Sequence, residues 1–391
     1  MYLICHLYHV HILQRHLGKG SYSDVFEVVD DDSQALISAH GNGRLKDTHP
    51  SSGASIATLQ RRPSRGSRRA THASSITEAI LSRPTPVSDR KRVLAMKCLR
   101  PQIRSDVDQF TIGAEDLVHE TAILANLSHP NIIKLYGRSS GSLTNAFRTN
   151  DGYFILLDKL DETLHDRIEM WKRPDSLCHQ GPTSEQISVA HSIANAMSYL
   201  HSKKIIFRDL KPENENVGFD SKILKLFDFG FAIGLPEKKC HSRNGVVEPG
   251  KIFDRCGTPR YMAPENGLHK GYTLSADVYS FGILLWEICT LSKPFASFKS
   301  ATHFEAAVFE GGERPLVDPS WPKHIRHLMI KCWSTDATAR PSITEVVSTL
   351  SLPLSNDTGT TSGKKEDPSQ PNLKRRTNQT RRRMSASIVG W

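Results

Sequence analysis

The sequence lacks the features that mark secreted and membrane-spanning proteins. Its seven cysteines form no CxxC pair, which predicts reduced thiols in an intracellular protein, without disulfides or a zinc site. The chain has no run of 18 apolar residues, so we expect no membrane span. Its opening, MYLICHLYHVHIL, is interrupted by histidines and has no basic leader, so we expect no signal peptide. These absences predict a protein of the cytoplasm.

Positive charge is abundant but confined to two segments. Residues 33–92 and 364–391 carry net charges of +8 and +6 out of a total of +10, so the rest of the chain is mildly acidic. This distribution disfavours a basic groove, and we expect no stable nucleic-acid partner. Both segments are rich in polar and basic residues without helix or strand periodicity. We predict a disordered insertion over about 31–92 and a basic disordered tail over 353–391, whose basic clusters leave nuclear import open.

The remaining sequence shows the periodicities of folded structure. The short apolar runs LAMKCL at 94–99 and YFILLDKL at 153–160 predict buried strands. The longer patterns SEQISVAHSIANAMSYLHS at 184–202 and ADVYSFGILLWEICTL at 276–291 predict helices. The tetrapeptide TSEQ offers a threonine or serine cap for the first of these helices. Strands are therefore expected to dominate the first part of the chain and helices the second.

Two glycines lie between strand-like segments in LGKGSYSDVF. With no side chains at Gly18 and Gly20, the backbone amides there can approach a phosphate closely. Ser23 occupies the third position of the usual GxGxxG pattern, and a glycine-rich hairpin without a ligand is an equal alternative. The loop alone therefore does not establish a nucleotide site.

A lysine, Lys97, lies in the middle of the apolar run LAMKCL. A charge buried in a strand needs a partner, although an edge lysine that reaches solvent is the simpler alternative. The segment HETAILANLSHPNII supplies Glu120, and Ile123, Leu124 and Leu127 follow it at helical spacing. We therefore predict that Glu120 leans inward from a core helix and pairs with Lys97.

Three further motifs follow in order: FRDLKPEN, LFDFG and, after a loop, GTPRYMAPE. Their order and spacing resemble the eukaryotic protein kinases of the serine/threonine type over residues 11–352. The resemblance implies an α+β, bilobal protein kinase fold. A small antiparallel β-rich N-lobe with one main helix would span about 11–157, and a larger, mainly α-helical C-lobe about 158–352. DVYSFGILLWEI with KCW and RPS resembles the tyrosine-kinase-like group, whereas Lys211 and Thr258 mark serine/threonine specificity.

The resemblance also implies which residues bind ATP and Mg²⁺ and which assist the transfer. By this resemblance Asp209 accepts the proton of the substrate hydroxyl and Lys211 steadies the γ-phosphate. Lys97, fixed by Glu120, orients the other two phosphates. The implied site residues are Asp209, Lys211, Lys97 and Glu120 for catalysis; Leu17, Gly18, Gly20, Val25, Ala95, Lys97, Asp158 and Leu160 for ATP binding; and Asn214 and Asp228 for the metal. The implied reaction transfers the γ-phosphoryl group of ATP to Ser or Thr of protein substrates.

The catalytic-loop motif departs from the family pattern at two places. Phe207 replaces the usual histidine, and we expect an aromatic to fill the same space beside Phe229. The letters EN are duplicated, so counting forward from Asp209 selects Asn214 as the metal ligand. Counting back from the strand VGFD selects Asn216. We predict Asn214, because two extra residues can bulge outward before the strand; the alternative is a catalytically impaired pseudokinase that acts as a scaffold.

Later landmarks of the resemblance imply three structural contacts. Glu265 is expected to pair with Arg340, and Asp277 to anchor the catalytic loop from a buried helix. Arg208 implies a cationic pocket for a phosphate on the activation loop. Asp254 stands four residues before Thr258, where such a phosphate commonly sits, so we predict that its carboxylate partly satisfies the arginine. A solvated loop charge at this position is an equal alternative.

Overall fold

The computed structural model groups the chain into two compact units. The first is formed by Met1–His165 and Pro212–Ile233, and the second by Asp166–Lys211 and Gly234–Trp391. The structure describes residues 12–20, 22–30, 92–139, 153–173, 182–212, 217–236, 240–242, 245–247 and 250–354. The predicted insertion and tail lie almost entirely outside these ranges. The predicted lobe boundary stays a prediction, because the two compact units alternate along the chain.

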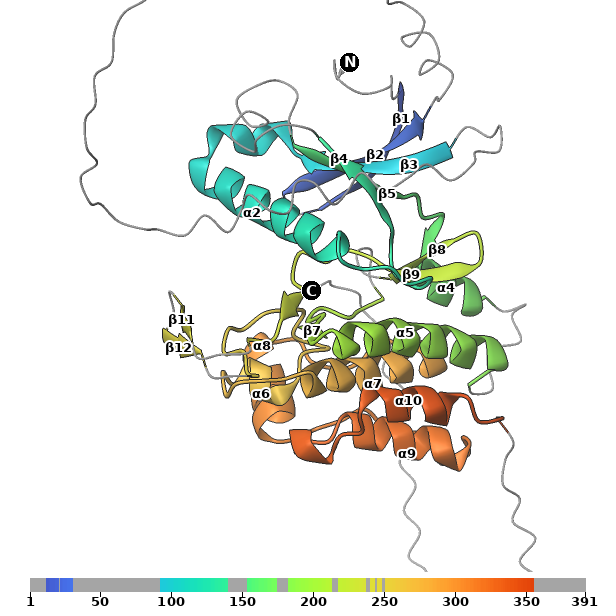
Figure 1. The fold of residues 1–391 in the computed structure, drawn as a ribbon. Coiled ribbons are helices and arrows are strands. Elements are labelled where there is room, and N and C mark those ends of the chain that lie inside the picture. The colour runs from blue at the N-terminus through green and yellow to red at the C-terminus, as the bar shows by residue number, and fades with distance from the viewer. Residues whose placement is uncertain are drawn as a thin grey trace, which may run out of the picture. The chain divides into compact units, whose positions relative to one another are not determined.

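A five-stranded antiparallel sheet, in the order β1-β2-β3-β5-β4, forms the centre of the first unit (Figure 1). Its strands are β1 (Ile12–Lys19), β2 (Ser23–Asp30), β3 (Arg92–Leu99), β4 (Leu135–Arg138) and β5 (Phe154–Asp158). Asp30 pairs with Arg92, so the long segment between β2 and β3 leaves and re-enters the sheet at one place. Because closure entropy grows only logarithmically with loop length, the sheet tolerates this insertion.

Alternation along the strands divides the side chains between the two faces of the sheet. Val28, Leu94 and Met96 are buried together, and Phe26 packs against them. Since successive side chains of a strand point to opposite faces, Lys97 belongs to the other face. That face is the one turned toward the following helix.

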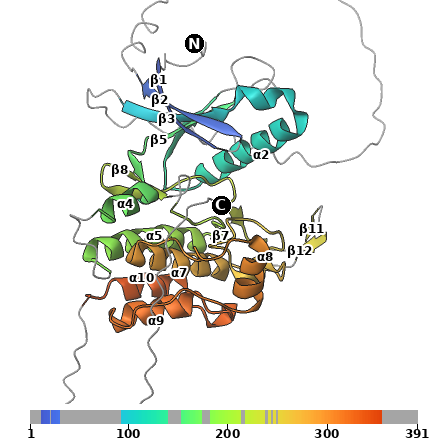
Figure 2. The same ribbon diagram turned by 180° about the vertical axis from the view of Figure 1, so that it is seen from behind.

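Helix α2 (Val107–Leu124) lies against this sheet after a short 3-10 turn, η2 (Pro101–Ser105) (Figures 1 and 2). The side chain of Asp106 caps the first turn of the helix by accepting hydrogen bonds from Asp108 N at 3.1 Å and from Gln109 N at 3.0 Å. The helix ends at Leu124. Beyond it, Asn126 N and Leu127 N donate to carbonyls three residues earlier in the chain, whereas an α-helix requires a spacing of four. Leu127 therefore lies beyond the helix, and the prediction that it shares a helical face with Glu120 is wrong.

Strand β5 is shorter than the predicted strand over 153–160. It ends at Asp158, after which Asp161 N donates to Phe219 O at 2.7 Å and draws the chain into a second sheet. That sheet consists of β6 (Glu162–Thr163), β8 (Val217–Asp220) and β9 (Ile223–Leu226). The run VGFD forms β8, as expected for the strand after the catalytic loop.

Helices dominate the second unit (Figure 2). They are α4 (Leu164–Trp171), which begins at the boundary, α5 (Ser184–Ser202), α6 (Pro264–Gly267), α7 (Ser275–Thr290), α8 (Ala301–Phe304), a π-helical turn η4 (Glu305–Glu310), α9 (Lys323–Cys332), η5 (Ala337–Ala339) and α10 (Ile343–Leu350). The short strands are β7 (Ile205–Ile206), β10 (Ile233–Gly234), β11 (Cys240–Ser242) and β12 (Gly245–Val247). Helix α10 packs against α5 and α9, and α7 packs against α5 and α9.

The two long helices predicted for this half are confirmed. Thr183 is the cap of α5: its side chain accepts from Gln186 N at 3.2 Å, and its own N–H donates to the Gln186 side chain at 2.8 Å. Helix α7 is buried on almost every side from Ala276 to Cys289, which explains its continuous apolar sequence. Across the described ranges no helix is long and apolar enough to cross a membrane.

Candidate active site

Lys97 of β3 is the centre of an ion cluster in the first unit. Its Nζ lies 2.7 Å from Glu120 Oε2 and 3.0 Å from Asp228 Oδ1. The other oxygen of Glu120 accepts the backbone N–H of Phe229 at 3.2 Å. The predicted pairing of Lys97 with Glu120 is confirmed, and Asp228 is a second partner that the sequence did not indicate.

The cluster fixes the charge of Lys97. Burial alone would lower the pKa of Lys97, because it disfavours the charged form. The carboxylates of Glu120 and Asp228 outweigh burial and raise the pKa above its ordinary value. The ammonium group therefore stays charged at every physiological pH, which fits the phosphate-binding role implied by the sequence.

Asp228 has the chemistry of a ligand for a hard cation. Its Oδ1 is engaged by Lys97, whereas no hydrogen bond to Oδ2 is recorded in the described part of the chain. The side chain is 26% exposed. Carboxylate oxygens are the ligands that Mg²⁺ prefers, so Asp228 fits the metal role implied by the sequence.

The glycine-rich hairpin is built as predicted. Gly18 of β1 pairs with Val25 of β2, and Gly20 N closes the turn by donating to Ser23 O at 2.8 Å. A Cβ added at Gly18 would meet no protein atom within 4 Å, so packing within the protein does not require the glycine. The open space at this backbone fits the close approach of a phosphate group.

All the residues predicted to bind ATP lie in the first unit. Val25 stands opposite Lys97, and Ala95 stands opposite Leu157 in the neighbouring strand. Leu160 follows β5, with its Cδ1 against the backbone of Gly218. Leu17, Gly18 and Gly20 come from the hairpin itself.

The carboxylate of Asp158 is occupied by the protein. Its Oδ2 accepts from Lys134 N at 2.8 Å and from Lys225 Nζ at 2.9 Å, and its Oδ1 accepts from the hydroxyl of Tyr136 at 2.8 Å. Because both carboxylate oxygens are engaged, any contact of Asp158 with ATP would come from its backbone atoms. The side chain instead ties β5 to β4 and β9.

Asp209 is the centre of a second cluster, within the second unit. Its Oδ2 accepts from Lys211 Nζ at 2.8 Å. Its Oδ1 accepts from Thr258 twice, from the backbone N–H at 2.7 Å and from the hydroxyl at 2.6 Å. Lys211 also reaches the hydroxyl of Thr258, at 3.1 Å. The two predicted catalytic residues are thus brought together, with Thr258 holding the carboxylate in one orientation.

The backbone at Gly257 lies close to the backbone of Arg208, and this brings Thr258 within reach of Asp209. Gly257 has φ +106, which side-chain-bearing residues rarely adopt, and a Cβ there would overlap the carbonyl oxygen of Arg208. Only glycine lets this segment lie directly on the catalytic loop. The amide of Thr258 can therefore reach Asp209.

The catalytic loop is anchored from the helix below it, as predicted. Asp277 of α7 accepts from Phe207 N at 2.8 Å and from Arg208 N at 2.9 Å. Its Oδ2 also lies 2.9 Å from Nε2 of His201 in α5. This buried carboxylate fixes the backbone immediately before Asp209.

Arg208 meets a carboxylate and a phenol. Its Nη1 donates to Asp254 Oδ2 at 2.7 Å and to the hydroxyl of Tyr272 at 3.2 Å, and that hydroxyl donates to Asp254 Oδ1 at 2.7 Å. The predicted contact between Arg208 and Asp254 is confirmed. Burial alone would raise the pKa of Asp254, but Arg208 and Tyr272 outweigh it and hold the pKa below its ordinary value.

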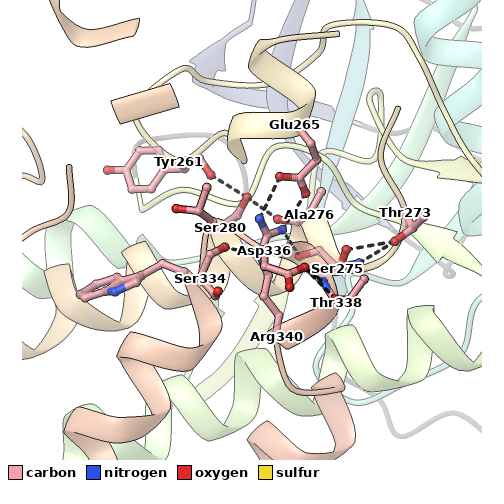
Figure 3. A network of polar contacts seen from close by, with 12 residues as sticks. Tyr261, Glu265, Thr273, Ser275, Ala276, Ser280, Ser334, Asp336, Thr338 and Arg340 are labelled. Atoms are coloured by element: carbon pink, nitrogen blue, oxygen red, sulfur yellow. Dashed lines mark hydrogen bonds and ion pairs between the residues drawn. The ribbon is translucent and has the colours of Figure 1, made fainter. Parts of the chain in front are cut away.

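A second arginine pair lies deeper in this unit (Figure 3). Arg340 donates to both carboxylate oxygens of Glu265, at 2.6 and 2.8 Å, and the prediction of this pair is confirmed. The guanidinium also donates to the carbonyls of Ser334 and Ser275, at 2.9 and 3.0 Å. Its hydrogen-bonding capacity is therefore almost fully used inside the protein.

Part of the predicted site lies outside the described residues. Asn214 and Asn216 both fall there, so the choice between them stays open. Among the described residues, sequence reasoning missed the side-chain role of Thr258, although its place in GTPRY carried the signal. The contact of Tyr272 with Arg208 had no sequence signal.

Comparison with known proteins identifies the family. A model of the protein kinase domain matches residues 86–350. The match begins after the glycine-rich hairpin, which the structure nevertheless places in the same sheet as β3. The matched residues include the Lys97, Asp209 and Asp228 positions.

Several curated proteins are similar over the same region. The serine/threonine/tyrosine-protein kinase HT1 of Arabidopsis thaliana is 30% identical over 288 residues, covering 71% of this chain and 66% of that protein. The dual specificity protein kinase shkC of Dictyostelium discoideum is 29% identical over 264 residues, covering 67% and 47%. A putative mitogen-activated protein kinase kinase kinase 7-like protein of Drosophila melanogaster is 31% identical over 239 residues, covering 58% and 53%. The chain thus spans about half to two thirds of the length of these relatives.

The family model covers more than half of the chain, and the fold and the ion pairs agree with it. The chain belongs to the protein kinase family.

Proposed function

We propose that the protein is an ATP-dependent serine/threonine kinase that transfers the γ-phosphoryl group to a hydroxyl of a protein substrate. The observation that carries the proposal is the arrangement of Asp209, whose carboxylate is held by Lys211 and Thr258. A carboxylate so oriented suits removal of a proton from an incoming hydroxyl. The relatives named as protein kinases support the same activity.

The residues of the chain divide the chemistry among them. Bound ATP with Mg²⁺ would supply the phosphoryl group and spread its charge. In this proposal Lys97, held by Glu120, binds phosphate oxygens, and Asp228 binds the metal through its open carboxylate oxygen. Asp209 takes the proton of the substrate hydroxyl, and Lys211 stabilises charge on the transferred group.

The preference for Ser and Thr over Tyr is part of the proposal. Two of the relatives carry names that include tyrosine or dual specificity, so similarity alone leaves the acceptor open. The preference for Ser and Thr is supported by the resemblance of the motifs that hold Lys211 and Thr258 to those of serine/threonine kinases. Cytoplasmic location, with nuclear import through the basic tail, belongs to the same proposal.

The test is incorporation of labelled phosphate from ATP and Mg²⁺ into a generic basic protein and into the chain itself. Wild type is compared with Asp209→Asn, Asn214→Ala and Asn216→Ala. We expect transfer by wild type and its loss, by at least about a hundredfold, in the Asp209 and Asn214 variants. Hydrolysis of the labelled product into phosphoamino acids reports whether Ser, Thr or Tyr received the group.

The alternatives give different results. Loss with Asn216→Ala in place of Asn214→Ala would move the metal ligand two residues along. A folded wild type that transfers no phosphate to any acceptor would overturn the proposal in favour of a scaffold. Thermal unfolding of each variant serves as the control for folding.

A further inference from the structure

His119 of α2 makes a hydrogen bond that the proposed reaction does not use. Its Nε2 lies 2.5 Å from the carbonyl oxygen of Ala232, 113 residues later in the chain and within the same unit. Because a carbonyl only accepts, Nε2 must carry the hydrogen. Both the imidazolium and one neutral tautomer meet this requirement. The bond ties α2 to the backbone that follows the LFDFG motif.

The segment from Phe229 to Ala232 is a tight turn that α2 holds at both ends. Ala232 N donates to Phe229 O at 3.0 Å and closes the turn. At its beginning, Phe229 N donates to Glu120 Oε1 at 3.2 Å; at its end, Ala232 O accepts from His119. Successive residues of a helix point about 100° apart, so His119 and Glu120 reach different ends of one turn.

Asp228 begins this turn in a conformation that needs support. Its φ is +59, in the left-handed region that is unfavourable for residues other than glycine. Such a conformation persists where surrounding contacts impose it. Ala232 is fully buried, so without His119 its carbonyl would lose this partner in a place away from water.

We propose that His119 is a positioning residue that keeps Asp228 oriented toward Lys97 and the metal. The role of Asp228 in this statement rests on the proposed kinase function. His119 acts through the turn: it fixes the end at Ala232, while Glu120 fixes the beginning. With one end released, the turn can rotate, and Asp228 Oδ1 leaves its position 3.0 Å from Lys97 Nζ.

The test compares three variants of the full chain. His119→Phe keeps an aromatic ring but removes the donor, and His119→Gln keeps an N–H donor. Thr111→Val is the matched control on the same helix, since it removes the side-chain hydrogen bond to Val107 O at 2.7 Å. Amide hydrogen exchange over residues 226–232 is measured without nucleotide, and the KM for Mg²⁺ and kcat are measured during phosphate transfer.

We expect His119→Phe to speed exchange of the Phe229 and Ala232 amides about tenfold and to raise the KM for Mg²⁺ by a similar factor. His119→Gln should restore most of both values, and Thr111→Val should change neither. Unchanged exchange in His119→Phe overturns the proposal, as does equal exchange in Thr111→Val. If wild type transfers no phosphate while exchange still responds, the kinase function fails and the tie between α2 and the turn stands.

Discussion

Two of the arginine–carboxylate pairs in the second unit have similar N···O distances and different burial. The Arg340 side chain is 0% exposed and contacts both oxygens of Glu265, whereas Arg208, whose side chain is 8% exposed, contacts one oxygen of Asp254, whose side chain is 44% exposed. Arg340 also binds two backbone carbonyls. Arg208 shares its carboxylate with the hydroxyl of Tyr272 instead.

Burial decides what each pair can contribute. Removing one partner of a buried pair leaves a charge without compensation, at a cost of about 3–5 kcal/mol, whereas an exposed pair is worth about 0–1 kcal/mol. The Glu265–Arg340 pair is therefore structural. Only Asp254 of the second pair is open to solvent, and Tyr272 stays as a partner of Arg208, so breaking this pair should cost folding less than breaking Glu265–Arg340.

The largest effect is expected from breaking the buried pair. Arg340→Met leaves Glu265 without its partner and should lower the free energy of unfolding by about 3–5 kcal/mol in urea titration. Arg173→Met, at an exposed arginine shortly after α4, is the matched control and should unfold as wild type does. Equal unfolding of the two variants would contradict the structural role of the pair.

A smaller effect is expected from disturbing the backbone beside Arg208. Gly257→Ala puts a methyl group against the Arg208 carbonyl in a disfavoured conformation, at a cost of about 1–3 kcal/mol in stability. The displaced Thr258 would release Asp209, so phosphate transfer should fall more than the unfolding change explains. Gly250→Ala also replaces a glycine with positive φ, but its Cβ would meet open space. Similar transfer rates in the two variants would argue against the close approach at Gly257.

Asp254→Asn should lower the rate of phosphate transfer much more than it lowers stability. We expect the free energy of unfolding to change less than in Arg340→Met, because Tyr272 still contacts Arg208, while phosphate transfer falls about tenfold because Arg208 loses its carboxylate. Asp318→Asn is the control, since that exposed carboxylate accepts from Ser320 N and, among the described residues, has no contact with Arg208. Wild type should also keep its activity after phosphatase treatment. Activity lost on that treatment, with Asp254→Asn unaffected, would show that a phosphate and not Asp254 satisfies the arginine.

Sequence reasoning succeeded where the signal lies within a few neighbouring residues, and where each partner of an ion pair could be expected from its own motif. The cap of α5 was predictable because a capping box spans four residues, and the structure selected Thr183 from the two candidates. The pair of Lys97 with Glu120 was predictable because a charge in an apolar strand needs a partner, and the pair of Glu265 with Arg340 followed from the family resemblance.

Contacts that involve the backbone could not be predicted in the same way. The bond of His119 to the Ala232 carbonyl depends on the path of the backbone after Asp228, whose left-handed conformation is not specified by any residue type in LFDFG. The end of α2 was missed because no glycine or proline marks it, and the change to three-residue turns at Asn126 depends on the packing around it. The duplicated EN lies outside the described residues, so there the sequence is still the only guide.

The smallest effect is expected in the pH dependence of the unfolding free energy, and it tests the Arg208–Asp254 pair alone. The folded-state pKa of Asp254 lies below its ordinary value of 3.8, so the pair contributes stability above pH 3.8 and loses it as pH falls through the lower, folded-state value. The difference in unfolding free energy between wild type and Asp254→Asn should therefore be small but positive near pH 6, and it should shrink as the pH falls below 3.8. Protonation makes the aspartate resemble the asparagine, which is why the two proteins converge. Urea unfolding of both proteins across this range gives the measurement, and a difference that stays constant would mean that the side chain, and not its charge, holds Arg208.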